Sequence, residues 1–150
     1  MRAVVQRVSN ACVSVDGVKV AEIESGLLVF LGIVETDKKE DIKWLSNKLA
    51  NLSIFNDSDN MMNSSLKDCE GSALIVSQFT LHAQIKKGNR LSYNRVAKSE
   101  IAKPLYEQFI EKFEADLEQS VHRGEFGANM KVALINDGPL TIIIDTKKRE

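Results

Sequence analysis

The stretch LINDGPLTIIID, residues 134–145, places a Gly-Pro pair between two runs that are rich in strand-forming residues. β-Branched side chains favour extended backbone on both sides of the pair. Proline, however, cannot donate a hydrogen bond to a neighbouring strand, and glycine permits a positive φ or a close backbone approach. Residues 136–139 are therefore either the turn of a hairpin or a rigid backbone segment that is placed against a ligand.

The chain has the composition of an ordinary globular protein. Its 150 residues are 43% hydrophobic and 27% charged, which is enough to build one core, so we expect a single domain over residues 1–150. The formal net charge is −1. This balance argues against strong non-specific binding to DNA or another phosphate backbone, although a local basic patch is compatible with it.

Cysteine spacing and hydropathy bear on metal binding and location. Cys12 and Cys69 lie far apart without metal-ligand spacing, so we expect reduced thiols and no metal site. The N-terminal residues alternate as in a strand and do not form a signal peptide. No apolar run approaches the roughly 18 residues that a bilayer span requires. These features predict a cytoplasmic protein without membrane contact.

Hydrophobic periodicity predicts several strands and two helices. The run LLVFLGIV is typical of a fully buried strand, and Asp16-Gly17 is typical of a hairpin turn. Strands are predicted over residues 2–8, 11–15, 18–23, 27–34 and 73–83, with a short one around 61–66 and two within 122–145. Residues 84–100 have neither period and are predicted to form a loop, which in a small domain is usually functional or disordered.

Both predicted helices have apolar stripes and recognisable ends. Thr36 or Asp37 is expected to cap the first, and Pro104 to lie near the first turn of the second. The helices are predicted over residues 39–54, with Ile42, Leu45, Leu49 and Leu52 at helical spacing, and over residues 99–118, with Ile101, Leu105, Phe109, Phe113 and Leu117 on one stripe.

This order of elements predicts an α/β fold of the α+β kind, in which a mixed, mostly antiparallel sheet carries two helices on one face. The other face would have many apolar strand residues and no helix to cover it. We therefore expect a homodimer in which sheet packs on sheet.

Common catalytic motifs are missing from the sequence, which contains no GxSxG, P-loop, GxGxxG, HExxH or CxxC pattern. A Ser-His-Asp triad would have to use His82 or His122, the only histidines. A lone histidine more often has a surface or structural role than a catalytic one.

The segment SQFTLHA, residues 77–83, follows the apolar run ALIV, and strand ends commonly carry site residues. On a continuous strand, Ser77 and Phe79 would face one side and Gln78 and Thr80 the other. The simplest interpretation places Phe79 in the core and the polar side chains in water. The alternative is that these residues form a site.

Two loops are further candidates. In HRGEFGANMKV, residues 122–132, glycines flank Phe126, and they either free backbone N–H groups for a ligand or merely permit turns. The loop at residues 84–100 is either solvated or able to bind phosphates, with Tyr93 available for stacking. Its candidate phosphate-binding residues are Lys86, Lys87, Arg90 and Arg95.

Taken together, these segments resemble the D-aminoacyl-tRNA deacylase family. The resemblance covers nearly the whole chain, from MRAVVQRVSNACVSVDG through SGLLVFLGI, SQFTLHA, KKGNR and LYEQF to GEFGANMKVALINDGPLT. Its two most specific parts are the strand-end motif Ser77-Gln78-Phe79-Thr80 and the motif Asn136-x-Gly138-Pro139-x-Thr141.

The resemblance implies an enzyme that hydrolyses the ester between a D-amino acid, or mischarged glycine, and the 3′-terminal adenosine of tRNA. It implies that L-aminoacyl-tRNA is spared, so that the enzyme proofreads chirality in translation. It also implies a cytosolic homodimer without a required cofactor. In the family, a cis Gly-Pro pair enters the active site of the other subunit, where its carbonyls exclude an L side chain.

Residue roles are implied by the same resemblance. The pocket around the scissile ester would be lined by Ser77, Gln78, Phe79 and Thr80. The chiral selector would be Gly138 and Pro139, oriented by Arg7, with Asn136 and Thr141 completing the motif. The terminal adenosine and amino group would be held by Phe126, Gly127, Ala128 and Met130, and the rest of the tRNA acceptor end by Lys86, Lys87 and Arg90.

Two mechanisms are open. Thr80 could act as a nucleophile, but no histidine is evidently placed to activate it. We favour attack by water assisted by the 2′-hydroxyl of the tRNA, with backbone N–H groups near residues 78–80 stabilising the oxyanion. The chain departs from the family pattern at His82, Leu91 and Tyr93, where tyrosine, proline and phenylalanine are usual, and this affects the loop at residues 84–100 rather than the reaction.

Three alternatives are left by the sequence. The chain could be a non-enzymatic RNA-binding module, although its near-zero net charge and 6% aromatic content count against this. It could hydrolyse some other ester or amide through Ser77 or Thr80. It could also be a family member with relaxed selectivity, but the segment NDGPLT favours strict selection of D substrates.

Overall fold

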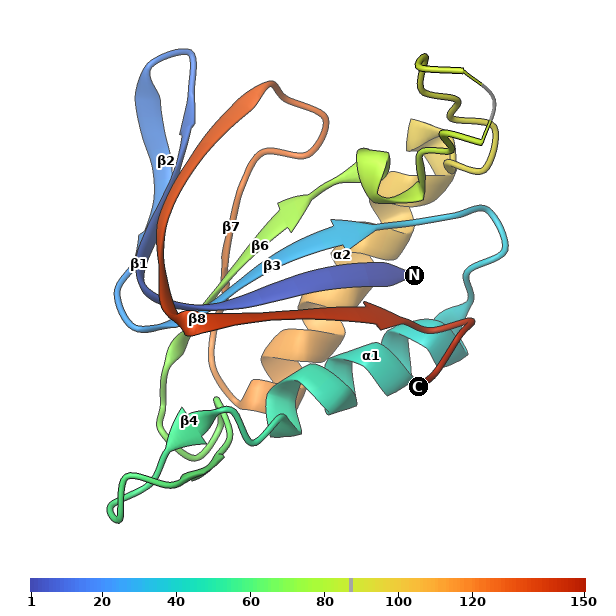
Figure 1. Ribbon diagram of the computed structural model, residues 1–150. Helices are drawn as coiled ribbons and strands as arrows, with labels where there is room; N and C mark the ends of the chain where they lie inside the picture. The colour runs from blue at the N-terminus through green and yellow to red at the C-terminus, as the bar shows by residue number, and fades with distance from the viewer. Residues whose placement is uncertain (87) are drawn as a thin grey trace.

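The computed structural model describes residues 1–86 and 88–150 (Figure 1). The main sheet consists of β1 (Arg2–Val15), β2 (Val18–Ile23), β3 (Gly26–Gly32), β6 (Ser72–Ser77), β7 (His122–Arg123) and β8 (Met130–Asp145). Its order is β2-β1-β3-β6-β7, and β8 pairs with β1. β1 is antiparallel to β2, β3 and β8, whereas the β3–β6 and β6–β7 pairs are parallel. The prediction of a mixed, mostly antiparallel sheet is thus confirmed.

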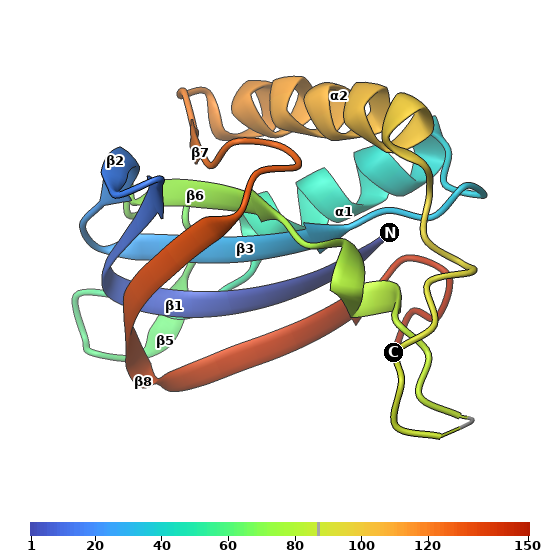
Figure 2. The same ribbon diagram turned by 90° about the horizontal axis from the view of Figure 1, so that it is seen from above.

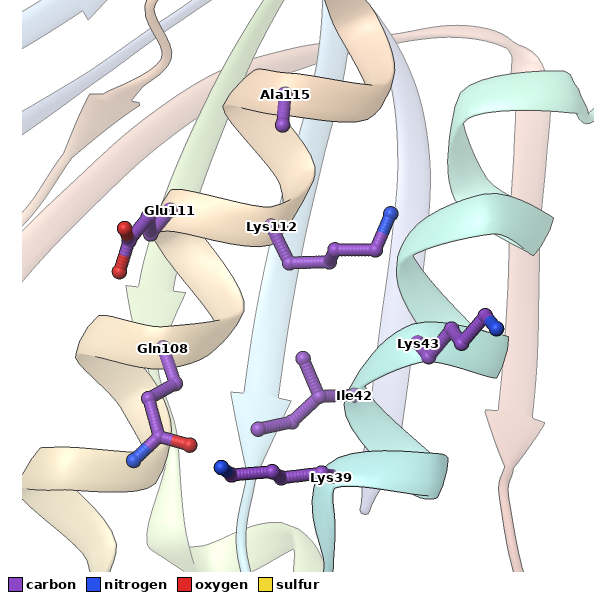
Figure 3. A pocket seen from close by; sticks show the side chains of 7 residues that line it. All are labelled: Lys39, Ile42, Lys43, Gln108, Glu111, Lys112 and Ala115. Atoms are coloured by element: carbon purple, nitrogen blue, oxygen red, sulfur yellow. The ribbon is translucent and has the colours of Figure 1, made fainter.

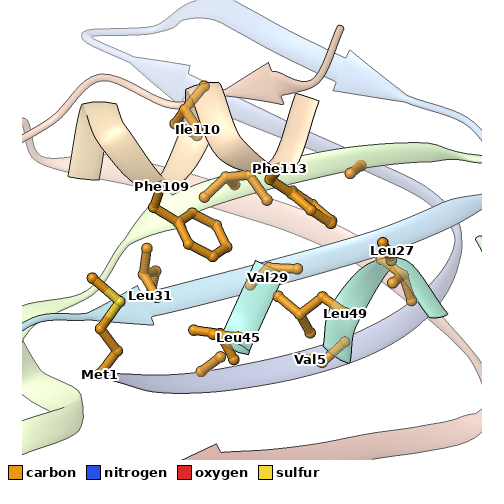
Figure 4. Close-up of a cluster of buried hydrophobic side chains, with 14 of the residues drawn as sticks. Met1, Val5, Leu27, Val29, Leu31, Leu45, Leu49, Phe109, Ile110 and Phe113 are labelled. Atoms are coloured by element: carbon orange, nitrogen blue, oxygen red, sulfur yellow. The ribbon is translucent and has the colours of Figure 1, made fainter. Parts of the chain in front are cut away.

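Two helices, α1 (Lys39–Asn51) and α2 (Ser99–Leu117), lie on the same face of this sheet, as expected (Figure 2). Val29 of β3 packs between them in a buried cluster with Leu45 and Leu49 of α1 and Phe109 and Phe113 of α2 (Figure 4). Burial of these large apolar side chains is the main force that holds helices to sheet.

The sheet covers its other face by curling on itself into a nearly closed, barrel-like arrangement (Figure 1). A second buried cluster includes Val13 of β1, Leu28 of β3 and Leu74 of β6, with Val132 and Leu134 of β8 packed against it. β3 is consequently buried on both faces, which explains its uninterrupted apolar sequence. Because β8 pairs only with β1 among the described strands, it forms an edge along its length.

Several boundaries differ from the sequence prediction. Residues 2–8 and 11–15 form one strand, β1, and the strand predicted over 73–83 ends at Ser77. Phe79–His82 instead form a short 3₁₀ helix, η1. The short strand expected near residues 61–66 is confirmed as β5 (Met62–Ser64), which pairs with β4 (Phe55–Asn56).

The cap predicted for α1 was wrong. The N-cap is Lys38, whose backbone N–H donates to the Asp41 carboxylate at 2.9 Å. Asp37 instead accepts the Val34 N–H at 2.9 Å and the Met1 amino group at 2.5 Å. Its carboxylate therefore joins the N-terminal residue to the loop before α1, and the helix ends at Asn51 rather than near residue 54.

The stripe predicted for α2 is rotated at its first turns. Ile101 is exposed and Leu105 only half-buried, because Ala102 and Tyr106 face the sheet there. Pro104 lies inside the helix beyond its first turn, rather than within the first turn. From Phe109 onward the predicted stripe is correct.

Candidate functional site

The Gly138-Pro139 pair is not the corner of a hairpin. The runs on either side both pair with β1, in one continuous direction, through Val8–Asn136 and Gln6–Thr141. β1 advances two residues between these pairs while β8 advances five, so the intervening residues bulge out of the edge strand. β8 bends sharply between its two halves (Figures 1 and 2). The expected cis bond between Gly138 and Pro139 is present.

Side-chain hydrogen bonds hold both ends of this bulge. The Asn136 side-chain oxygen accepts the Leu140 N–H at 2.7 Å, and its amide nitrogen donates to the Thr141 hydroxyl at 3.0 Å. The Arg7 guanidinium donates to the Asp137 carbonyl at 3.0 Å and to the Ile54 carbonyl at 2.6 Å. Arg7 thus connects the bulge to the loop after α1.

The tip of the bulge presents main chain to the outside. Gly138 and Pro139 are both exposed. Gly138 has a φ of +139°, and a Cβ at this position would lie 2.9 Å from the Leu140 nitrogen and 3.2 Å from Nη2 of Arg7. Glycine is therefore the residue that the bulge requires.

A separate cavity of about 330 Å³ lies where β6 ends, beside the first residues of α2. The Gln78 N–H donates to the Leu31 carbonyl at 2.8 Å. The chain therefore stays paired with β3 for one residue beyond the end of β6, up to the turn into η1. Of the predicted site residues, the cavity is lined by Ser77, Gln78, Phe79, Phe126 and Gly127. Sequence reasoning missed its remaining walls, which are Leu31, Ile33, Val96, Ala97, Lys98, Ser99 and Ala102.

The turn into η1 overturns the strand alternation predicted for residues 77–82. Phe79 is 55% exposed, so the interpretation that placed it in the core was wrong. The Thr80 hydroxyl accepts a hydrogen bond of 2.5 Å from the Gln78 side-chain amide. Within the described part of the chain, the N–H groups of Phe79 and Thr80 have no acceptor, as is usual at the start of a helix.

The loop between β7 and β8 forms the opposite wall of the cavity. Gly127 has a φ of +77°, and the Ala128 N–H closes a turn on the Glu125 carbonyl at 3.2 Å. The Phe126 ring packs on Tyr106 of α2, with ring centroids 5.3 Å apart. Ala128 and Met130 are not among the described residues that line the cavity.

Neither histidine forms a triad with Ser77 or Thr80 through hydrogen bonds of the described residues. His82, at the end of η1, is half-buried, and its Nε2 atom is buried without a partner in the described structure. Burial lowers the pKa of His82, with a smaller contribution from the positive charge of Arg2. His122 is exposed at the start of β7.

The two sets of predicted residues lie apart within one chain. Ser77 is in the row of the sheet that contains Leu31, Ala3 and Ile144, whereas the bulge lies beside Arg7. The cavity and the bulge are therefore separated by four residues along β1, which is about 13 Å, and by three strand spacings across the sheet, which is about 14 Å. Arg7 and Asp137 line a different cavity, of about 540 Å³, which shares no residue with the first.

The positively charged segment between η1 and α2, residues 84–97, is called the basic loop. Lys86 and Arg90 are exposed, and Lys87 lies outside the described residues. Tyr93 packs on Phe79, with ring centroids 5.1 Å apart. Arg95 lines a further cavity together with Arg2 and His82.

A groove of about 440 Å³ between the helices is lined by none of the predicted site residues. Ile42 of α1 points toward α2, and Lys39 of α1 and Lys112 of α2 extend into the space between the helices (Figure 3). Among the described residues, no group of three His, Cys, Asp or Glu could hold a metal ion. Within the described residues, neither α1 nor α2 has an apolar stretch long enough to cross a membrane.

Comparison with known proteins agrees with these motifs. A family model described as D-Tyr-tRNA(Tyr) deacylase matches residues 4–145. The chain belongs to this deacylase family. A D-aminoacyl-tRNA deacylase of Christiangramia forsetii is 57% identical over 149 residues, covering 99% of each chain. The predicted family and the predicted enzyme class, a hydrolase of D-aminoacyl-tRNA esters, are confirmed.

Solved structures share the deacylase fold. A protein described as c-Myc DNA unwinding element binding protein superposes with a TM-score of 0.90 at 36% identity, covering 97% of this chain and 98% of that one. A probable eukaryotic D-amino acid tRNA deacylase superposes with a TM-score of 0.81 over 95% and 97% of the two chains, at 19% identity. The second likeness shows the fold alone.

Proposed function

We propose that the cavity beside Ser77 holds the 3′-terminal aminoacyl-adenosine of tRNA, and that the Gly138-Pro139 bulge of a second copy closes it. The observation that carries this proposal is the separation of the two elements. The bulge offers exposed main chain that is held rigidly by Arg7 and Asn136, yet it lies far from the cavity of its own chain. A complete site therefore needs two chains.

The edge strand offers a surface for this second copy. Ile135 and Ile143 of β8 are 56% and 71% exposed on either side of the bulge. An exposed edge of this length with apolar side chains is a ready site for association. A two-fold arrangement would bury both edges and would bring each bulge to the cavity of the other chain.

Main-chain atoms of the bulge would then select for chirality. Two carbonyl groups that face the Cα of the bound aminoacyl group would leave room for hydrogen but not for an L side chain. D-aminoacyl-tRNA and glycyl-tRNA would be hydrolysed to free amino acid and tRNA, while L-aminoacyl-tRNA would be rejected. This would proofread chirality in the cytoplasm, where aminoacyl-tRNA is used.

For the chemical step, we propose attack by water assisted by the 2′-hydroxyl of the tRNA. The N–H groups of Phe79 and Thr80 are available to stabilise the developing oxyanion. The Thr80 hydroxyl is held by the Gln78 amide rather than by a general base, so it is a poor nucleophile. Cations of the basic loop, including Lys86 and Arg90, would contact the acceptor end, and no cofactor is needed.

Thr80→Ala tests this mechanism. We expect it to keep D-Tyr-tRNA hydrolysis within about tenfold of the wild-type rate, because positioning and oxyanion stabilisation are retained. Single-turnover kinetics would measure the rate. A loss of more than about a thousandfold, the size typical of removing a principal catalytic group, would instead make Thr80 the nucleophile.

The experiment that decides the function compares D-Tyr-tRNA, Gly-tRNA and L-Tyr-tRNA as substrates of the purified protein. We expect release of D-tyrosine and glycine and at least a hundredfold slower release of L-tyrosine. Binding of tRNA without hydrolysis would indicate an RNA-binding module. Efficient turnover of D-tyrosine esters that lack adenosine would indicate a general esterase.

The name of the relative at 36% identity raises DNA as a second ligand. The net charge of −1 does not favour it, since DNA binding at physiological salt rests on a strong basic field. Competition of duplex DNA against tRNA in the same hydrolysis assay would expose such binding.

A further inference from the structure

The basic loop, residues 84–97, leads from η1 to α2, and its described residues, 84–86 and 88–97, project away from the sheet (Figures 1 and 2). It contains no acidic residue. Among the described residues, no carboxylate lies within ion-pair distance of Lys86, Arg90 or Arg95. A bridge between Gln84 and Ser92, with backbone hydrogen bonds of 2.8 and 3.0 Å, fixes these two residues against each other. The positive charge of the loop is therefore available to an anionic partner.

An exposed aromatic pair lies between this loop and the cavity. Phe79 and Tyr93 are 55% and 40% exposed, and their rings are tilted by 59° with centroids 5.1 Å apart. Phe79 lines the cavity, whereas Tyr93 does not. The pair thus runs from the cavity mouth to the base of the basic loop. The pair therefore offers flat aromatic faces to a ligand beside the cavity.

We propose that Tyr93 and the cations of the basic loop bind the single-stranded 3′ end of tRNA just before its terminal adenosine. Tyr93 stacks on the penultimate base, and Arg90 and Arg95 contact the flanking phosphates. Stacking on aromatic rings combined with positive charge is how proteins hold single-stranded RNA ends. The proposal rests on the proposed function, because it assumes that the terminal aminoacyl-adenosine occupies the cavity.

The chemistry favours RNA over an acidic protein partner. An acidic protein surface would meet the cations equally well but would give the exposed aromatic faces no flat partner. A nucleotide offers both a phosphate and a base, and the covalent link to the adenosine in the cavity places the next base beside Phe79.

The test compares D-Tyr-tRNA with 3′-O-(D-tyrosyl)adenosine, which lacks the preceding nucleotides. In Tyr93→Leu, we expect kcat/KM for the tRNA relative to the short substrate to fall at least tenfold. In Tyr93→Phe, which keeps the aromatic face, this ratio should change less than twofold. An equal fall for both substrates would place Tyr93 in support of the cavity and overturn the proposal, as would an unchanged ratio in Tyr93→Leu.

Charge is tested by salt dependence. Arg95→Ser should reduce the slope of log KM for tRNA against log salt by about 0.7, the value for one phosphate contact with a single strand. The matched control is Lys43→Ser on α1, which should leave the slope unchanged. Equal slopes in the two variants would contradict the proposal. Failure of the wild type to hydrolyse either substrate would instead refute the proposed function.

Discussion

At Gly138 the backbone leaves no space for a side chain. A Cβ would lie 2.9 Å from the Leu140 nitrogen, and L residues are strained at a φ of +139°. The same rigidity that excludes a side chain holds the exposed main chain in place. Rigid main chain is suited to selection by shape, because it cannot yield to an L side chain in the way that a flexible side chain can.

Gly138→Ala should therefore distort the bulge and weaken its selectivity. We expect a loss of about 1–3 kcal/mol in the free energy of unfolding and at least a tenfold smaller ratio of D-Tyr-tRNA to L-Tyr-tRNA hydrolysis. Denaturant unfolding and paired kinetics would measure both. Gly17→Ala, in the turn between β1 and β2, is a control, since Gly17 also has a positive φ but has open space around it. Unaltered selectivity in Gly138→Ala would contradict the role of the bulge.

His82 predicts a pH dependence of stability. Burial lowers its pKa, and the positive charges of Arg2 and the Met1 amino group act in the same direction, while a hydrogen bond with the Gly32 backbone and the charge of Asp37 oppose them. The folded state therefore binds fewer protons than the unfolded state as the pH falls through the usual titration range of histidine. The stability gained by burying neutral His82 is therefore fully present at pH 7 or above, and it is lost as the pH falls through the lowered pKa.

Between pH 7 and pH 5, we expect Tm of the wild type to fall more steeply than Tm of His82→Gln. His122→Gln, at an exposed position, should follow the wild type. The depressed pKa of Asp41, about 2, keeps its own titration below this window. Parallel curves for the wild type and His82→Gln would show that His82 is not responsible.

At the scale of elements, α2 supports the loop between β7 and β8. The buried Tyr106 ring packs against the ring of Phe126, and Glu107 forms a 2.6 Å ion pair with Arg123. The motif LYEQF thus has a structural explanation, because consecutive residues of one helix hold one wall of the cavity. The ion pair is exposed and contributes at most about 1 kcal/mol.

Tyr106→Leu should loosen this wall. An aromatic pair contributes about 0.5–1.5 kcal/mol beyond burial, so we expect KM for D-Tyr-tRNA to rise about two- to tenfold with little change in kcat. Steady-state kinetics would separate the two constants, with Tyr106→Phe as the conservative variant that keeps the ring. A fall in kcat at constant KM would argue that Tyr106 acts on the chemical step instead.

At the scale of the whole molecule, we propose that the site divides between two chains. Mixed dimers test this directly, because Ser77→Trp fills the cavity while Gly138→Ala damages the bulge. If the site forms in trans, one of the two sites in each mixed dimer combines an intact cavity with an intact bulge. We expect D-selective hydrolysis to reappear on mixing. Its absence in dimers verified by mass spectrometry would place both elements in one chain.

The sequence by itself determined the strand and helix order, the family motifs and the residue types of both candidate elements. Periodicity sufficed for β3 and for α2 from Phe109 onward, since the burial patterns there follow from local spacing. Tertiary structure alone decided that β6 ends at Ser77, that Phe79 faces outward, and that the Gly-Pro segment is a bulge rather than a turn. Those features depend on pairing with β1 and β3, which are distant in sequence, and on packing against α2. The local sequence does not specify these partners, because the same extended residues are compatible with a hairpin, a bulge or a buried strand. Pairing with a neighbouring strand decides which of these structures forms.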